Sequence, residues 1–228
     1  NVYTGIKGAE MKFSRNLWQF RAKNGRITSK ITFAHIEREQ NLEQWQGSQI
    51  CEIGFDELTH FSEKIFFYML SRNRSSCGVK PFVRATCNPD ADSWVAKFIE
   101  WWIDQETGYP IPERSGVIRW FIRREEVIYW ADKREELWER FDLETSEDRG
   151  KVKSVTFIMS TLKDNKELLK IDPGYLANLE ALPLIERERL LHGNWKIKAA
   201  AGLFFKRTQL GEILEKVPQD VIQWVRCW

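Results

Sequence analysis

The sequence has little of what anchors a protein in a membrane, binds zinc or forms disulfide bridges. No apolar run reaches the roughly 18 residues that a membrane-spanning helix requires. Residues 1–15 have neither the apolar centre of a signal peptide nor an initiator Met. The 4 cysteines lie far apart without C-x-x-C spacing, and only 3 histidines accompany them. A zinc site is therefore not expected, and reduced thiols in a cytoplasm are the simplest interpretation.

The sequence also lacks a strong excess of either charge. It has 35 Lys and Arg against 33 Asp and Glu, a net charge of +2. That total gives no argument for nucleic-acid binding, although it is compatible with a local basic face. With 228 residues, 43% of them hydrophobic, the chain is long and apolar enough for one large domain or two small ones.

The apolar pattern of the first half predicts alternating strands and helices. Strands are expected at 30–36, 50–57 and 80–89, and helices at 62–74 and 90–105, with Ser62 as the cap of the first helix. Strand, helix, strand and helix in close succession predict an α/β fold with a parallel sheet.

The second half gives a more varied pattern. We expect a loop at 106–116, a hairpin at 117–132, a short helix at 133–141 and a strand at 152–161. Asp172 and Pro173 have the pattern of an N-cap and a first helical residue, and a further helix begins near Pro183 and stops near Gly193. Residues 219–228 are strand-like.

Two adjacent acids, Asp56 and Glu57, follow the apolar strand "ICEIGF". In parallel α/β sheets, ligands bind beyond the carboxyl ends of the strands. Neighbouring side chains on a strand point in different directions, so one acid can hold Mg²⁺ through water while the other orients an attacking water. This is the Walker B arrangement. Adjacent acids are also common where a strand simply ends at the protein surface, and that interpretation stays open. In addition, Glu52 and Gly54 interrupt the apolar run of the strand.

The next predicted strand ends in "TCNP" about 30 residues further on, a separation that suits one intervening helix. Thr86 and Asn88 are expected at the same edge of the sheet as Asp56. An amide there can hydrogen-bond both a γ-phosphate and the polarised water, and can therefore sense hydrolysis. The alternative is that Asn88 and Pro89 form only a turn.

A series of segments resembles, in order, the large subunit of tailed-phage terminases, the DNA-packaging motors. The segments are "WQGSQICEIGFDELTHF", "YMLSRNRS", "RATCNPDADSWVAKFI", "IRWFIRREEVIYWADKREEL", "VTFIMSTLKDN", "DPGYLANLEALPLIERERLLHGNW" and "AGLFFKR". The resemblance covers nearly the whole chain. It implies a P-loop ATPase joined to a nuclease of RNase H-like fold, with ATP and Mg²⁺ as cofactors.

The resemblance also implies roles for particular residues. Asp56 corresponds to the magnesium ligand and Glu57 to the catalytic glutamate, while Thr86 to Asn88 correspond to the coupling motif beside the nucleotide. Some relatives place an arginine finger where this chain has Gln46. Arg72 and Arg74 are the nearest substitutes, and a surface charge pair is an equally good interpretation of each.

The resemblance further implies the domain organisation. Residues 1–116 correspond to part of the ATPase core, 117–200 to its remainder with a small lid or linker subdomain, and 201–228 to the start of the nuclease. No G-x-x-x-x-G-K-[ST] motif occurs in the sequence. We therefore expect the phosphate-binding loop upstream of Asn1 and the nuclease acids after Trp228, and we expect this chain alone to be inactive.

The partners implied are viral double-stranded DNA, the portal protein of the procapsid, the small terminase subunit and further copies in a ring, with no membrane. The implied location is the bacterial host cytoplasm and, transiently, the portal vertex. Two alternatives stay open: another P-loop motor such as a helicase, and a catalytically silent module that kept the fold.

Overall fold

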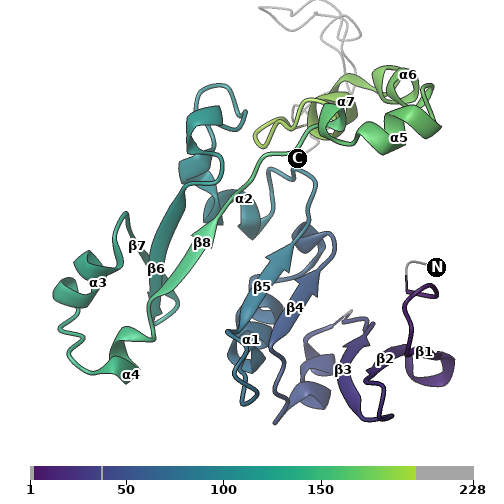
Figure 1. Cartoon of the computed structure of the whole chain (residues 1–228). Helices are drawn as coiled ribbons and strands as arrows, with labels where there is room; N and C mark the ends of the chain where they lie inside the picture. The colour runs from purple at the N-terminus through teal and green to yellow at the C-terminus, as the bar shows by residue number, and fades with distance from the viewer. Residues whose placement is uncertain (1–2, 37, 199–228) are drawn as a thin grey trace, which may run out of the picture. The chain divides into compact units, whose positions relative to one another are not determined.

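The computed structural model describes residues 3–36 and 38–198, and it divides into two compact units between Cys87 and Asn88. Figure 1 labels the helices and strands along the chain. No helix among the described residues is long and apolar enough to cross a membrane.

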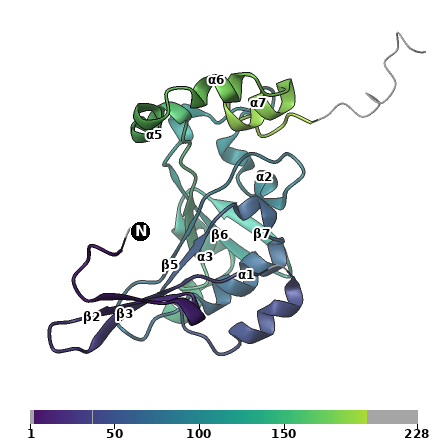
Figure 2. The same ribbon diagram turned by 90° about the vertical axis from the view of Figure 1, so that its right-hand side faces the viewer.

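The first unit begins with a three-stranded antiparallel sheet in the order β1-β2-β3. The strands are β1 (Ala9–Lys12), β2 (Leu17–Arg21) and β3 (Ile27–Thr32), and β2 and β3 lie side by side in Figures 1 and 2. The strand predicted at 30–36 is thus confirmed in part, but the sequence did not indicate β1 and β2. A tight turn with Gly25 at φ +80° joins β2 to β3, and such a hairpin makes the pairing antiparallel.

The second element group of this unit is a parallel strand pair covered by a helix. Strands β4 (Glu52–Phe55) and β5 (Phe82–Ala85) pair in parallel, and α1 (Glu63–Arg72) connects them. The predicted strands and helix are therefore confirmed, with shorter bounds. The Ser62 hydroxyl accepts the Ile65 N–H at 3.3 Å, which confirms the predicted cap.

Burial alternates along β4, and only one face of the strand is covered. Ile53 and Phe55 are buried, whereas Glu52 and Gly54 are exposed. The rings of Phe55 and Phe66 on α1 lie 5.5 Å apart, so the helix packs on the apolar face. Because the described residues contain only this one parallel pair, the fold is mixed α/β with small sheets.

The second unit contains an antiparallel sheet in the order β7-β6-β8. The predicted hairpin is confirmed as β6 (Ile118–Arg124) and β7 (Val127–Ala131), and the predicted short helix as α3 (Arg134–Arg140). After α4 (Ser146–Arg149), strand β8 (Lys153–Thr156) is shorter than predicted. It ends where Thr156 pairs with Ile118, the first residue of β6, although the carbonyl of Phe157 still accepts the N–H of Gly116 at 2.8 Å.

The helix predicted at 90–105 is wrong as a single element. The structure has α2 (Trp94–Phe98), capped by the Ser93 hydroxyl, followed by a 3-10 helix, η4 (Glu100–Trp102). The chain then leaves helical geometry because Ile103 forms a β-bridge with Pro110.

The predicted N-cap at Asp172 is also wrong. Asp172 closes α5 (Lys166–Ile171), a helix that the sequence analysis missed, and α6 (Tyr175–Glu180) begins only after Gly174. The backbone N–H of Asp172 bonds the Leu168 carbonyl, so this residue serves the preceding helix. The last predicted helix is confirmed as α7 (Leu184–Leu190).

The remaining short elements are 3-10 helices: η1 (Phe13–Arg15), η2 (Glu39–Trp45), η3 (Leu58–His60), η5 (Pro112–Arg114) and η6 (Leu162–Asp164). Of these, η5 falls within the loop predicted at 106–116. The strand predicted at 219–228 and the nuclease start predicted at 201–228 lie outside the described residues.

Candidate functional site

The carboxyl ends of β4 and β5 meet at one edge of the first unit. Phe55 is paired with Ala85, so the residues that follow the two strands emerge together. The Thr86 hydroxyl donates a hydrogen bond of 2.6 Å to Oδ1 of Asp56. The register thus brings Asp56 and Thr86 into contact, as the sequence predicted for one edge of a parallel pair.

Glu57 is held at the same junction by its backbone. Its N–H donates to the Thr86 hydroxyl oxygen at 3.3 Å, and the next N–H, of Leu58, donates to the Thr86 carbonyl at 2.8 Å. Glu57 has φ 56° and ψ 57°, a left-handed conformation that costs a residue with a Cβ roughly 1–2 kcal/mol. Strain of this kind, held in place by neighbouring hydrogen bonds, is typical of functional sites.

His60, which was not among the predicted site residues, contacts Glu57. Its Nδ1 lies 2.9 Å from Glu57 Oε2, across the single turn of η3. The side chains are 71% and 52% exposed, so solvent screens their attraction and its main effect is on the direction of the carboxylate. The Glu-x-x-His spacing was the available sequence signal, because residues three apart face each other on a helical turn.

Asn88 stands two residues after Thr86 and is the first residue of the second unit. Its proximity to Asp56 therefore remains a prediction. Within the second unit, the segment that follows Asn88 is fixed to α7. Arg189 Nε donates a 2.9 Å hydrogen bond to the carbonyl oxygen of the buried Pro89.

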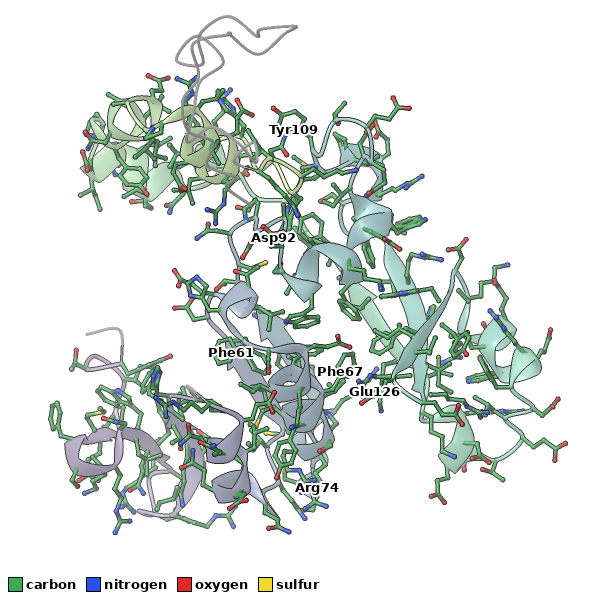
Figure 3. All side chains as sticks on the ribbon, turned by 180° about the vertical axis from the view of Figure 1, so that it is seen from behind. Phe61, Phe67, Arg74, Asp92, Tyr109 and Glu126 are labelled. Atoms are coloured by element: carbon green, nitrogen blue, oxygen red, sulfur yellow. The ribbon has the colours of Figure 1, made fainter. Side chains whose placement is uncertain are left out.

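The two arginine candidates lie at the other end of β4. Arg74 donates from Nε to the Ser48 carbonyl at 3.2 Å and from Nη2 to the Gly47 carbonyl at 3.1 Å. The guanidinium of Arg72 stacks 5.1 Å from the centre of the Tyr68 ring. Figure 3 shows Arg74 and Phe61 at opposite ends of the group formed by β4, α1 and β5.

These contacts give Arg74 a structural role, because it fixes the backbone that leads into β4. The carbonyl of Ile50 accepts the Arg74 N–H, and the distance from Ile50 to Asp56, six residue steps along the strand, is about 20 Å when extended. An arginine finger that acts on a neighbouring copy stays a prediction for both residues.

The pKa values of two thiols in the first unit are shifted in opposite directions. Cys87 follows Thr86, and burial raises its pKa to about 11, so it stays protonated at neutral pH. Cys77 is exposed, and a hydrogen bond from the Ser75 hydroxyl, 3.1 Å from Sγ, lowers its pKa. Among the described residues no group of three or more His, Cys, Asp or Glu side chains could hold a metal ion by itself.

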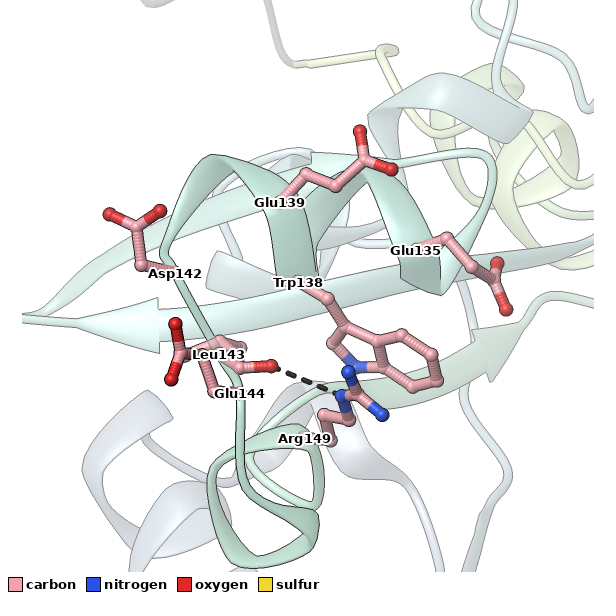
Figure 4. A pocket seen from close by; sticks show the side chains of 7 residues that line it. All are labelled: Glu135, Trp138, Glu139, Asp142, Leu143, Glu144 and Arg149. Carbon is pink, nitrogen blue, oxygen red and sulfur yellow. Dashed lines mark hydrogen bonds between the residues drawn. The ribbon is translucent and has the colours of Figure 1, made fainter.

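A separate open pocket of about 340 Å³ belongs to the second unit and contains none of the predicted site residues. Figure 4 shows its lining: Glu135, Trp138, Glu139, Asp142, Leu143, Glu144 and Arg149. The guanidinium groups of Arg149 and Arg134 each lie 4.9 Å from the centre of the Trp138 ring. The ring is therefore already stacked within the chain, and the pocket fits a packing role.

The chain matches a protein family over almost its full length. Residues 5–212 fit the family described as terminase large subunit, T4likevirus-type, N-terminal. The chain therefore belongs to the terminase large subunit family of tailed phages. No curated protein and no solved structure shows a significant match to it.

Proposed function

We propose that this chain contributes the magnesium-dependent ATPase site of a phage DNA-packaging motor, which moves viral double-stranded DNA into the procapsid. The complete gene product would also cut DNA with its nuclease domain. The observation that carries this proposal is the junction of Asp56, Glu57 and Thr86, built on parallel strands in a terminase chain. In this proposal, β4 and β5 belong to a larger P-loop sheet.

The junction suits Mg²⁺ in its donor chemistry. Asp56 is exposed, and Thr86 bonds only its Oδ1, so the second carboxylate oxygen is open to a magnesium-bound water. Mg²⁺ commonly uses one or two carboxylates, several waters and the substrate phosphates instead of a cage of protein ligands. When bound, the ion would neutralise charge on the phosphates of ATP.

The neighbouring residues would then have separate roles in ATP hydrolysis and in its coupling to movement. Glu57 would orient and polarise the attacking water, with His60 and the left-handed backbone fixing the direction of its carboxylate. Thr86 would hold Asp56, and Asn88 would sense the γ-phosphate. The bond from Arg189 to Pro89 would pass a shift of this segment to α7.

The partners follow from the same proposal. They are ATP, duplex DNA, the portal protein, the small terminase subunit and further copies in a ring. The motor would act in the bacterial host cytoplasm and at the portal vertex.

The test is carboxylate-to-amide substitution in the complete gene product. Glu57→Gln should retain nucleotide binding and lower ATP turnover by about 10²–10⁴-fold, because an amide cannot accept the proton. Asp56→Asn should instead shift the magnesium dependence to higher concentrations. Glu43→Gln, an exposed acid on η2, is the matched control and should keep the wild-type rate.

Wild-type turnover in both acid variants would contradict the proposal. Asp56 and Glu57 would then be ordinary surface residues at the end of a strand. Turnover that depends on single-stranded nucleic acid, without packaging of duplex DNA, would favour a helicase.

A further inference from the structure

The total charge of the chain is nearly neutral, but the first part of the chain is strongly basic. Residues 3–36 hold seven Lys and Arg and one carboxylate, Glu10, a net charge of +6. Because the whole chain carries +2, the other residues together carry −4. The basic segment is the part of the first unit that forms β1, β2 and β3, and we call it the basic sheet.

One face of the basic sheet is apolar and covered. The strand register aligns Met11, Trp18 and Ile31 in one row across the three strands. The ring of Tyr3 packs edge-on against Trp18 and Phe20, at 5.4 and 5.7 Å between ring centres. This face therefore serves the core of the sheet.

The opposite face carries charged side chains on the two outer strands. The register aligns Glu10, Gln19 and Lys30 in one row, and Lys12 lies on the same face two residues from Glu10. Arg21 reaches this row, because its Nε lies 3.7 Å from Glu10 Oε2 and its Nη2 donates to Gln19. Gln19 and Leu17 in the central strand of this face are buried, whereas Glu10 and Lys30 on the two outer strands are exposed, so the outer strands present the charged groups to solvent.

The single acid of the segment is already shared by two cations. Glu10 pairs with both Lys12 and Arg21, and the hydrogen bond from Lys12 lowers the pKa of this carboxyl. Five exposed basic side chains then have no carboxylate partner among the described residues: Lys7, Arg15, Lys23, Arg26 and Lys30.

These cations are spread over the length of the sheet. Arg15 lies in the turn between β1 and β2, Lys30 lies on β3, and Lys23 and Arg26 flank the turn at the far end. Lys7 lies near that far end, because the carbonyl of the next residue, Gly8, accepts the N–H of Arg21. A strand of six residues is about 20 Å long.

We propose that the basic sheet contacts the phosphate backbone of duplex DNA. Duplex DNA carries about one charge per 1.7 Å of its axis, so a surface about 20 Å long meets enough phosphates for all five cations. Contacts from Lys and Arg to phosphates are independent of base sequence, as a motor that moves along any DNA requires. The choice of duplex DNA among polyanions rests on the proposed function.

The test measures binding of the complete 228-residue chain, without nucleotide, to a fluorescein-labelled duplex of about 30 base pairs of mixed sequence. Fluorescence anisotropy gives the binding constant at salt concentrations from about 50 to 200 mM. With five phosphate contacts, the slope of log K against log salt should be about −4 to −5. The triple variant Lys23→Gln, Arg26→Gln, Lys30→Gln should reduce the size of that slope by about 2–3.

A matched control removes the same charge elsewhere. Lys163, Lys166 and Lys170 are exposed lysines around η6 and α5 in the second unit, and their triple change to Gln should leave the slope unchanged. Lys23→Arg with Lys30→Arg keeps the charge and should keep the slope. Circular dichroism of each variant verifies that the sheet is folded.

An unchanged slope in the folded basic-sheet variant, or an equal loss in the control, would overturn the proposal. Tighter binding to polyglutamate than to the duplex would also overturn it, in favour of an acidic protein partner. Because no nucleotide is present, the result is independent of the Glu57→Gln test. Failure of DNA binding and failure of the ATPase proposal are therefore distinguishable.

Discussion

Thr86 offers a way to disturb both candidate acids without altering either. Its hydroxyl donates to Asp56 Oδ1 at 2.6 Å and accepts the N–H of Glu57 at 3.3 Å. Thr86→Val keeps the shape of the side chain and removes both bonds. We expect this substitution to lower ATP turnover in the complete gene product while nucleotide still binds.

The expected magnitude follows from the two bonds. A hydrogen bond to a charged group contributes about 1.5–3 kcal/mol, and a neutral one about 0.5–1.5 kcal/mol. Thr86 and Asp56 are exposed, so water replaces part of each bond and the lower end of each range applies, about 2 kcal/mol for the two bonds together. If that free energy serves to position the acids for reaction, the rate of ATP turnover falls about 30-fold.

Two measurements separate positioning from stability. ATP turnover is followed during a magnesium titration, and thermal unfolding is recorded for the same variants. Thr86→Ser is the control, because it keeps the hydroxyl and loses only a methyl group. Equal rates in wild type and Thr86→Val would refute this account, and equal losses in the Val and Ser variants would assign the effect to the methyl group.

Three further predictions address other parts of the chain. Leu137→Ala should destabilise the second unit by about 2–5 kcal/mol in denaturant unfolding, because Leu137 is 1% exposed in its core, whereas truncation of the 59% exposed Leu184 should cost far less. Iodoacetamide should label Cys77 well before Cys87 at pH 8, as read by peptide mass spectrometry. The pKa of Cys87 is raised to about 11, so its thiolate forms only as the pH approaches that value. Asn88→Ala should raise the ATP consumed per base pair packaged, since a lost amide contact costs about 1–3 kcal/mol, and an unchanged ratio would leave the turn interpretation.

The sequence predicted the elements whose signals are local. Residues 50–57 and 80–89 are short apolar runs that end in polar groups, and both contain strands. Ser62 precedes an apolar stripe at helical spacing and caps α1. In each case the residues that determine the structure lie within a few positions of one another, so no tertiary information is needed.

The failures have a different cause, because distant residues decide them. The stretch 90–105 has helical spacing, yet Ile103 bridges to Pro110 and the helix stops early. The antiparallel pairing of β3 depends on β2, which the sequence analysis did not recognise as a strand. A local pattern cannot report a partner strand, and a tertiary hydrogen bond outweighs a weak helical preference.

In the candidate site, some features follow from local sequence and others depend on distant residues. The acids at the end of β4 were visible in the sequence, but the contact of Thr86 with Asp56 depends on the register of β4 against β5. A shift by one residue would point Thr86 to the other face of the pair. The Glu-x-x-His spacing pointed to a contact of Glu57 with His60, but the geometry of that contact depends on the left-handed backbone of Glu57 and the turn of η3.

Charge shows most clearly why position matters more than composition. A net charge of +2 over 228 residues suggests no nucleic-acid surface, yet a ligand responds only to charges within about 8 Å at physiological salt. The charges near the basic sheet are mainly cations, whereas those at the junction of Asp56, Glu57 and Thr86 include two carboxylates. Added salt should therefore weaken contact with DNA steeply, because that contact releases counterions. The short hydrogen bonds between Thr86 and Asp56 should change little, so ionic strength separates the two proposed functions of the first unit.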